Sequence, residues 1–262
     1  MSKREPKYTQ KGGATDRFWL RKSIFKQFDP SVLGLEDILA KKETFEALAV
    51  ILDLKDFTAF CDQRDPHLVI PQFVKSFLEW LFKKLRAELL IEEAGNEVVL
   101  WSHLPFFGKF LGDGVLLLWD VTDIEGEAKR NIVYSFDIIC TDYEIEFLPS
   151  IKKNTSKAPT KLRCGIAQGQ VTSIAEGRDF VGLCINIASR LQKLGDGAFS
   201  FAFTQKGLEP DEGEDWYENF RLIKIPIRGI SNDELVYVLK AEFRKLSNDL
   251  KRAYRPWPGF FA

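Results

Sequence analysis

The stretch AVILD, residues 49–53, is an apolar run that ends on a carboxylate. A short apolar run of this kind predicts a buried strand, which we place at residues 46–53. A second carboxylate, Asp113, lies in the tight turn GDG between the segment KFL and the apolar run VLLL. A core strand that ends in Asp, next to a hairpin whose turn carries another Asp, can place two hard oxygen ligands side by side. The pair predicts a site for Mg²⁺ or Mn²⁺, which favour one or two carboxylates together with substrate phosphates.

Two further polar residues stand four positions apart in the segment INIASRL, residues 185–191. If this segment is helical, Asn186 and Arg190 share one face of the helix. The backbone amides of residues 54–58, which follow the first carboxylate, could cradle a phosphate as a loop of N–H donors. Together with the two carboxylates, these features indicate phosphoryl chemistry on a nucleotide.

Composition sets the outer limits of the interpretation. The chain has 262 residues and a formal net charge of −1, so no global electrostatic attraction to nucleic acid or to a membrane is expected. It has no secretory apolar region, and no uncharged apolar run approaches the roughly 20 residues that a membrane span requires. Its four cysteines lack CxxC spacing and read as reduced, buried thiols. We therefore expect a soluble, cytoplasmic protein without nucleic-acid or membrane partners.

The order of predicted elements gives the fold class. We expect strands at 46–53, 97–107, 115–119, 162–167, 171–175, 198–203, 220–227 and 234–239, and helices at 71–94, 125–148, 182–194 and 241–254. The order strand, helix, strand, strand, helix, strand matches a split βαβ, ferredoxin-like core of the α+β class. We expect a flexible basic lead at 1–16, an amphipathic extension at 17–43, one domain at 46–240, and a helix and tail at 241–262.

Four motifs in a fixed order carry a resemblance to a known family. They are D-x-x-x-F-T from Asp53, K-x-x-G-D-G from Lys109, R-x-G-I-x-x-G-x-V from Arg163 and D-x-x-G-x-x-x-N-x-A-S-R from Asp179. Over roughly residues 46–239 the chain resembles the class III nucleotide cyclase catalytic domain. In that family two catalytic domains pair head to tail, and each active site draws on both chains. The resemblance therefore implies a homodimer with sites at the subunit interface.

The resemblance also implies a role for each residue that matches a motif position. Two ions per site, Mn²⁺ or Mg²⁺, would be held by Asp53, Leu54 and Asp113. The base would face Lys109 and Asp179, with Ile51, Leu111 and Phe180 as the walls of its pocket. Asn186 would position the ribose, and Arg190 would stabilise the reacting phosphate. The triphosphate would meet Phe57, Thr58, Arg163 and Arg228. Two departures from the family pattern are Asp56, where a glycine is usual, and Ala167, where a histidine is common.

The implied reaction converts a nucleoside triphosphate to its 3′,5′-cyclic monophosphate and pyrophosphate, but the base stays open. A lysine donor and an aspartate acceptor can read adenine or cytosine, and uracil with the two roles exchanged. Phe180 is bulkier than the aliphatic residue often found at its position, which favours a pyrimidine. Our first choice is UTP, converted to cUMP, with ATP and CTP as alternatives. The layout of the chain is similar to the bacterial anti-phage pyrimidine cyclases of the Pycsar kind, which implies a role in antiviral defence.

Each motif also has a purely structural interpretation. Asp113 could serve only its hairpin turn, Asn186 and Arg190 could form a solvated helix face, and Lys109 could form a structural ion pair with Asp179. The palm domains of polymerases and diguanylate cyclases also pair two carboxylates on this strand order, but the sequence has no GG-(D/E)-EF turn. A pseudo-cyclase that only binds nucleotide is the non-enzymatic alternative. The presence of both carboxylates together with Asn186 and Arg190 argues against it.

Overall fold

A computed structural model describes residues 43–63, 65–94, 97–153, 157–174, 177–209, 215–227 and 229–256. The predicted lead at 1–16, nearly all of the predicted extension at 17–43, and Arg228 lie outside these residues. The chain divides into a small unit, Met1–Thr44 with Thr172–Val181, and a large unit, Phe45–Val171 with Gly182–Ala262. In the small unit, the Glu43 amide donates to Ser173 Oγ at 2.9 Å. The predicted domain boundaries stay a prediction.

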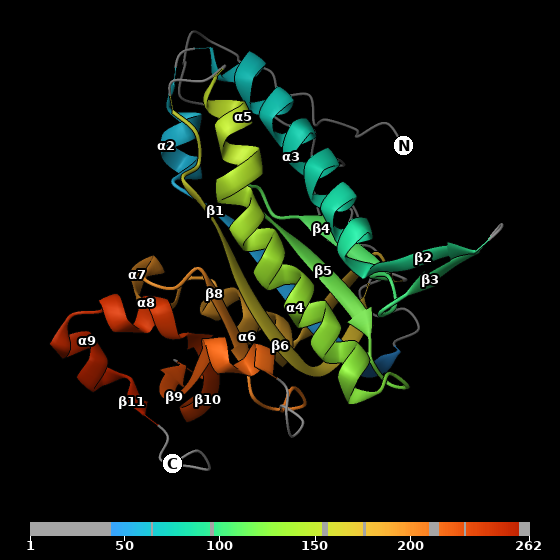
Figure 1. Ribbon diagram of the computed structural model, residues 1–262, viewed down its shortest axis with the longest axis vertical. Helices are drawn as coiled ribbons and strands as arrows, with labels where there is room; N and C mark the ends of the chain where they lie inside the picture. Colours follow the sequence, from blue (N-terminus) through green and yellow to red (C-terminus); the bar gives the residue numbers. More distant parts are fainter. Residues whose placement is uncertain are drawn as a thin grey trace, which may run out of the picture. The chain divides into compact units, whose positions relative to one another are not determined.

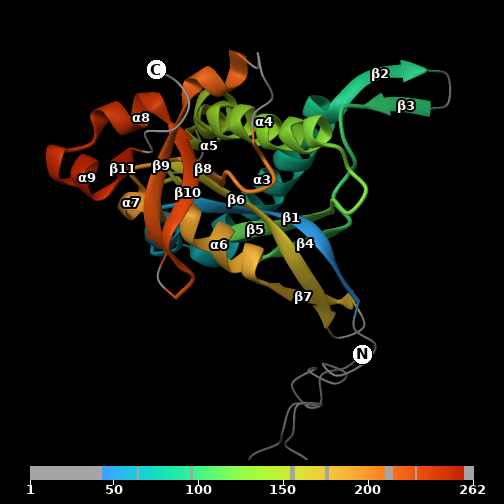
Figure 2. The same cartoon turned by 90° about the horizontal axis from the view of Figure 1, so that it is seen from below.

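The large unit contains the predicted ferredoxin-like core. Its elements follow in the order β1 (Thr44–Lys55), α3 (Pro66–Leu89), β4 (Phe107–Phe110), β5 (Gly114–Asp120), α4 (Gly126–Asp142) and β6 (Lys161–Ile174). The strands lie side by side in the order β6-β1-β5-β4, and β5 is antiparallel to both of its neighbours. Helices α3 and α4 cover one face of this sheet (Figure 1), and α6 (Leu183–Leu191) lies on the other face (Figure 2). The α+β, ferredoxin-like prediction is confirmed.

The remaining elements extend this core. They are α2 (Phe57–Cys61), β2 (Leu90–Ala94), β3 (Glu97–Leu100), a π-helix (Tyr143–Phe147), α5 (Leu148–Lys152), β7 (Asp179–Gly182), α7 (Leu194–Gly197), β8 (Phe201–Thr204), a 3₁₀-helix (Asp215–Asn219), β9 (Phe220–Ile227), β10 (Ser231–Leu239), α8 (Lys240–Lys245), α9 (Asn248–Ala253) and β11 (Arg255–Pro256). Beyond β6 the sheet continues through β8, β10, β9 and β11, while β7 pairs with β6. Strands β2 and β3 form a separate two-stranded sheet.

Strand β1 is buried on both faces, and its two faces have different partners. Leu48, Val50 and Leu52 belong to the same hydrophobic core as Phe77 of α3 and Phe136 of α4. Because side chains alternate along a strand, Ile51 and Asp53 face the opposite side, which is the side of α6. The first carboxylate of the sequence therefore lies on the face of the sheet that α3 and α4 leave uncovered.

Helix α6 approaches strand β6 very closely, and a glycine makes this possible. A Cβ atom at Gly165 would overlap the carbonyl oxygen of Ala188 and lie 2.7 Å from the Gln192 amide nitrogen. Any other residue at this position would push the helix away from the strand. Gly165 therefore fixes how near α6 lies to the sheet.

The predicted helix from Pro71 to about residue 94 is wrong at both ends. Helix α3 begins at Pro66, the first helical position, where a missing N–H group costs nothing. Pro71 lies inside the helix on an exposed position, where it removes only one backbone bond. After Leu89 the chain turns into strand β2, whose partner β3 carries the β-branched residues Val98 and Val99. The predicted strand at 97–107 is likewise two short strands, β3 and β4, that pair with different neighbours.

The predicted pair of short strands at 162–167 and 171–175 is also wrong, because β6 is one continuous strand. Gly169 lies between the two predicted strands, but its missing side chain makes room for α6, since a Cβ there would lie 3.3 Å from Cys184 Cβ. The predicted helix at 241–254 is divided into α8 and α9, where Ser247 caps the second helix by accepting from the Leu250 amide at 3.3 Å.

Two predictions of a global kind can be compared with the described residues. All four cysteines lie there and are free thiols, and three of them are buried, as expected. Within the same residues, none of the helices combines the length and the apolar character that crossing a bilayer would require.

Candidate active site

The end of β1 and the β4–β5 turn meet in direct contact. Asp53 is opposite Gly114 in the β1–β5 ladder, and a Cβ atom at Gly114 would overlap the carbonyl oxygen of Leu52. The Leu54 amide donates to the Asp113 carbonyl at 2.8 Å. Only a glycine after Asp113 lets the turn come this close to the strand. The structure thus brings Asp53 and Asp113, the two carboxylates of the opening motifs, together at one point of the sheet.

The Asp53 carboxyl group is buried and lies close to other charges. Asp53 is 3% exposed, and this burial raises the pKa of its carboxyl group, an effect to which the nearby Asp113 charge adds. Hydrogen bonding and charge from Arg163 lower that pKa, and Lys193 lowers it further. A buried carboxylate beside a second one is a donor set that a divalent cation would stabilise. The residues present therefore fit the implied ions.

A cation at this point would need further ligands from outside the carboxylate pair. Among the described residues, no group of three or more His, Cys, Asp and Glu side chains is placed so that it could hold a metal ion by itself. Mg²⁺ and Mn²⁺ accept this situation, because they commonly combine one or two carboxylates with water and substrate phosphates. The site is consistent with ions that arrive together with a nucleotide.

Arg163 lies against the first carboxylate. Its Nε donates to Asp53 Oδ2 at 2.8 Å, and its Nη2 donates to the same oxygen. On its other side, a Cβ at Gly197, which has a φ of 80°, would lie 2.7 Å from Arg163 Nη1. The guanidinium thus bonds to a carboxylate and occupies space that a side chain at position 197 would need. The sequence assigned Arg163 to the triphosphate, and the structure adds a role as the counter-charge of Asp53.

Lys193 is a site residue that sequence reasoning missed. It lies two residues after the end of α6, and its charge lowers the pKa of Asp53. The spacing of Asn186, Arg190 and Lys193 by four and three residues was a usable signal, because such residues gather on one side of a helix that continues.

The loop after β1 explains one departure from the family pattern. Asp56 has a φ of 69°, in the left-handed region where glycine carries no steric cost. Its carboxylate Oδ2 accepts from Thr160 Oγ1 at 2.6 Å, which holds the strained residue in place. The backbone amides of residues 54–58 were expected to cradle a phosphate. One of them, the Leu54 amide, already donates to the Asp113 carbonyl oxygen. Phe57 is buried, so it could meet a phosphate only through its backbone, whereas Thr58 is exposed.

Three residues form a row across β1, β5 and β4. Leu116 is opposite Ile51 on one side and opposite Lys109 on the other. Residues directly opposite each other in antiparallel strands point to the same face, so Lys109 and Ile51 share the face that carries Asp53. Beside them, Phe110 is 40% exposed and Leu111 is 43% exposed. Two of the predicted base-pocket residues, Ile51 and Leu111, thus lie near Lys109, one buried and one open to the surface.

The exposed face of α6 carries the two residues that were predicted to contact the ribose and the reacting phosphate. Asn186 and Arg190 are both exposed and lie one helical turn apart, while Cys184, Ile187 and Ala188 form the buried face. The helical prediction that placed the pair on one face is confirmed. In the small unit, Asp179 and Phe180 lie on β7, where Asp179 Oδ1 accepts from the Phe180 amide at 3.0 Å. The pairing of Asp179 with Lys109 stays a prediction.

Comparisons with known proteins place the fold. No protein-family model and no curated protein sequence matches the chain. Among solved structures, the adenylyl cyclase CyaB from P. aeruginosa matches with a TM-score of 0.56 at 15% identity, over 76% of this chain and 95% of that one. The guanylyl cyclase Cya2 matches with a TM-score of 0.55 at 15% identity, over 75% and 92%. A bacterial light-regulated adenylyl cyclase matches with a TM-score of 0.53 at 14% identity, over 87% and 62%.

At these sequence identities the comparisons show a shared fold and no more. The chain has the fold of class III nucleotide cyclase catalytic domains. The solved structures that share it include cyclases of both adenylyl and guanylyl type, so the fold by itself does not select a base.

Proposed function

We propose that this protein is a nucleotide cyclase, which converts a nucleoside triphosphate to its 3′,5′-cyclic monophosphate and pyrophosphate. The observation that carries the proposal is the contact between the end of β1 and the β4–β5 turn, which sets Asp53 beside Asp113 on a cyclase fold. Asn186 and Arg190 support it, because they share the exposed face of α6.

In the proposed reaction the ribose 3′-oxygen attacks the α-phosphorus in line, and pyrophosphate leaves. Asn186 holds the ribose in the attacking pose, which removes most of the entropic cost of the cyclisation. Arg190 offers a planar, multi-donor cation to the charge that develops on the α-phosphate oxygens. Two bound Mn²⁺ or Mg²⁺ ions, held by Asp53, the Leu54 carbonyl and Asp113, would supply Lewis-acid activation of the 3′-hydroxyl and charge neutralisation at the leaving phosphates.

The triphosphate is assigned to the cations and amides near this point. Arg163 already lies against Asp53, so it can contact an incoming phosphate without leaving the site. The backbone of Phe57 and the exposed Thr58 follow at the start of α2. Arg228, which lies outside the described residues, is proposed for the same role on the match of its sequence position alone.

We propose that the active form is a two-fold homodimer. Phe110 and Leu111, next to Lys109, expose large apolar side chains. The same chain carries a carboxylate half-site at Asp53 and Asp113 and a second half-site on α6. Two-fold pairing would join each half-site to its complement on the partner and create two equivalent sites.

Our proposal for the base is UTP, with ATP and CTP as the alternatives. Support comes from the bulk of Phe180 and from Lys109, whose donor groups suit the carbonyl oxygens of uracil. A cytoplasmic role in anti-phage defence belongs to the same proposal and rests on the similarity of the chain's layout to Pycsar-type cyclases.

The direct test of the proposed function is a substrate panel. Purified protein is incubated with Mn²⁺ and, separately, with ATP, GTP, CTP and UTP, and the products are separated by liquid chromatography and mass spectrometry. We expect a cyclic monophosphate from UTP, and no product when EDTA is added. A cyclic product from another base would correct only the base. Binding without product for all four would favour the pseudo-cyclase.

Replacing Asn186 by Ala should lower turnover by about 10- to 100-fold, because the ribose is no longer held for in-line attack. The exposed side chain carries no packing, so the thermal unfolding midpoint should stay unchanged.

Mixing the Asn186→Ala and Asp113→Asn proteins tests whether each active site is shared between two chains. If protomers exchange at random, about half of the dimers are mixed, and each mixed dimer has one intact site out of two. The mixture should therefore show about a quarter of wild-type activity. A mixture that stays inactive would contradict sites shared between two chains.

A further inference from the structure

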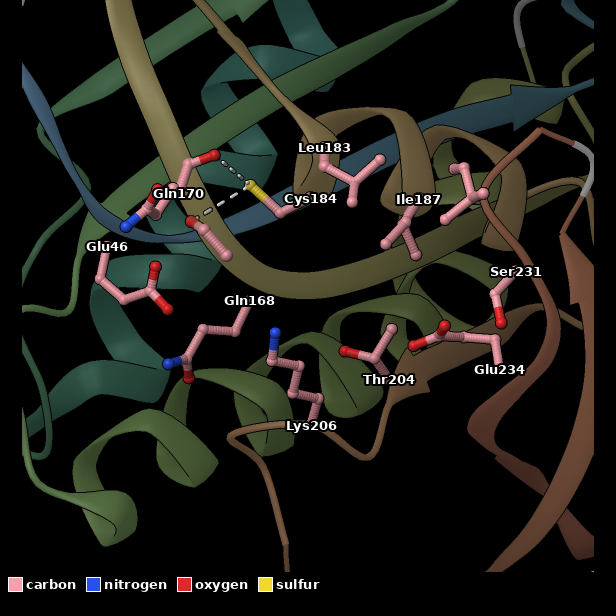
Figure 3. A pocket seen from close by; sticks show the side chains of 12 residues that line it. Glu46, Gln168, Gln170, Leu183, Cys184, Ile187, Thr204, Lys206, Ser231 and Glu234 are labelled. Atoms are coloured by element: carbon pink, nitrogen blue, oxygen red, sulfur yellow. Dashed lines mark hydrogen bonds between the residues drawn. The ribbon is translucent and has the colours of Figure 1, made fainter.

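Helix α6 runs along strand β6 in the direction of Arg163. Figure 3 shows the start of the helix, where Cys184 Sγ donates to the Gly169 carbonyl oxygen at 3.4 Å. The end of the helix lies over Gly165, where a Cβ atom would be 2.7 Å from the Gln192 amide nitrogen. Between these two contacts the helix rises about 12 Å and the strand spans about 13 Å, so the two run side by side. Arg163 comes two residues further in the same direction, on the same face of the strand.

The segment that follows α6 passes the ion pair between Arg163 and Asp53. The Lys193 amide donates to the Arg190 carbonyl at 3.2 Å, so the backbone keeps turning in a helical manner up to this lysine. Four residues later the chain lies against Arg163, because a Cβ atom at Gly197 would be 2.7 Å from its Nη1. Arg163 Nε in turn donates to Asp53 Oδ2 at 2.8 Å. Lys193 is therefore in the stretch of chain that leads from the end of α6 to the first carboxylate.

The electrostatics agree with this placement of Lys193. Its positive charge lowers the pKa of the Asp53 carboxyl group, which shows that the two groups are near enough to interact. The lysine side chain is exposed, and no ion pair joins its ammonium group to another side chain of the described residues. Arg163, by contrast, already gives both Nε and Nη2 to Asp53 Oδ2. Lys193 is thus a cation close to the carboxylate pair that can accept an anionic partner from solution.

The proposed substrate brings more negative charge to this point than the proposed metal ions can neutralise. A triphosphate group carries about four negative charges at neutral pH, and the carboxylates of Asp53 and Asp113 add about two. Two divalent cations offset only about four of these roughly six charges. The excess is costly here, because Asp53 is buried and water screens its surroundings poorly. Arg163 and Lys193 are the two cations whose charges already act on Asp53, and together they would balance the remainder.

We infer that Lys193 binds the two leaving phosphates of the nucleoside triphosphate, at the carboxylate half-site of its own chain. This inference rests on the proposed function and adds a contact that lies outside the four sequence motifs. The reacting phosphate is assigned to Arg190, which leaves the β- and γ-phosphates for Lys193. A lysine suits this role, because its compact charge on a flexible stem can turn from Asp53 to a phosphate oxygen when metal ions and nucleotide enter.

The test is isothermal titration of the full-length protein with Mn²⁺ and each of the four 3′-deoxynucleoside triphosphates, which lack the attacking hydroxyl group and are not converted. Lys193→Met should weaken the binding of the preferred triphosphate at least about tenfold, and Lys193→Arg should stay within about threefold of the wild type. Lys83→Met, on the exposed surface of α3, is the charge-matched control and should bind as the wild type does. If none of the four binds the wild type, the proposed function fails together with this inference. If one binds and Lys193→Met binds it equally well, only the inference is overturned.

A second measurement separates phosphate binding from a structural role of Lys193, since a lysine just after a helix also suits the negative end of the helix dipole. Lys193→Met is titrated with Mn²⁺ alone, and its thermal unfolding is followed without ligands. Loss of a cation beside two carboxylates should leave Mn²⁺ binding as tight as in the wild type or tighter, with an unchanged unfolding midpoint. Weaker Mn²⁺ binding together with a lower midpoint would show that Lys193 supports the fold of the site, and would overturn the inference.

Discussion

Replacing Asp113 by Asn should lower cyclase turnover by at least about 1,000-fold, which corresponds to about 4 kcal/mol of activation free energy. The change removes one of the two carboxylates proposed to hold the metal ions. It should not unfold the protein, because the turn is held by backbone bonds, from Leu54 N to Asp113 O and from Leu111 N to Gly114 O, both at 2.8 Å. Turnover and thermal unfolding are measured on the same preparation.

The matched control is Asp123→Asn, which makes the same charge change at an exposed loop position. It should leave turnover within about twofold of the wild type, as is usual for surface substitutions. Because the Asp113 charge raises the pKa of Asp53, its removal should also lower that pKa, which nuclear magnetic resonance of the carboxyl carbon can follow. Turnover by Asp113→Asn above a tenth of the wild-type rate would refute the metal assignment.

Replacing Gly165 by Ala should destabilise the protein by about 3 kcal/mol or more. The added methyl group overlaps the Ala188 carbonyl oxygen and lies 2.7 Å from the Gln192 amide nitrogen, and both are backbone atoms that cannot rotate away. The helix has to move, and Asn186 and Arg190 move with it. We therefore expect a lower urea midpoint and a loss of turnover in the fraction that remains folded.

Gly169→Ala, on the same strand, is the control for this substitution. Its added methyl group would lie 3.3 Å from Cys184 Cβ, a tight contact with a side chain instead of an overlap with backbone. The control should cost about 1 kcal/mol or less, in line with mild overpacking. Equal stability of the two variants would show that α6 does not lie as close to β6 at Gly165 as described.

The ferredoxin-like core could be predicted because its signals are local. The apolar run before Asp53 and the turn around Asp113 each contain their own evidence of strand and hairpin. Strand β6 could not be predicted as one piece, since Gly169 resembles a turn residue until its contact with Cys184 is known. Pro66 and Pro71 can each occupy the first position of a helix, and α3 begins at Pro66.

In the candidate site, too, the features with local sequence signals could be predicted and the long-range contacts could not. The approach of Asp53 and Asp113 followed from a strand end and a tight turn. The contact of Arg163 with Asp53 joins residues 110 positions apart, so it depends on which strands are neighbours. The left-handed backbone of Asp56 was not predicted, although the glycine that is usual at this position in the family pattern was a usable signal of such a conformation.

The most direct test of the central proposal is a ³¹P nuclear magnetic resonance time course of the wild-type protein with Mg²⁺ and each nucleoside triphosphate in turn, with UTP first. Cyclisation predicts that the signals of pyrophosphate and of a cyclic phosphodiester grow in equal amounts, without orthophosphate. Formation of orthophosphate and a nucleoside diphosphate, or an unchanged spectrum with all four substrates, would contradict it.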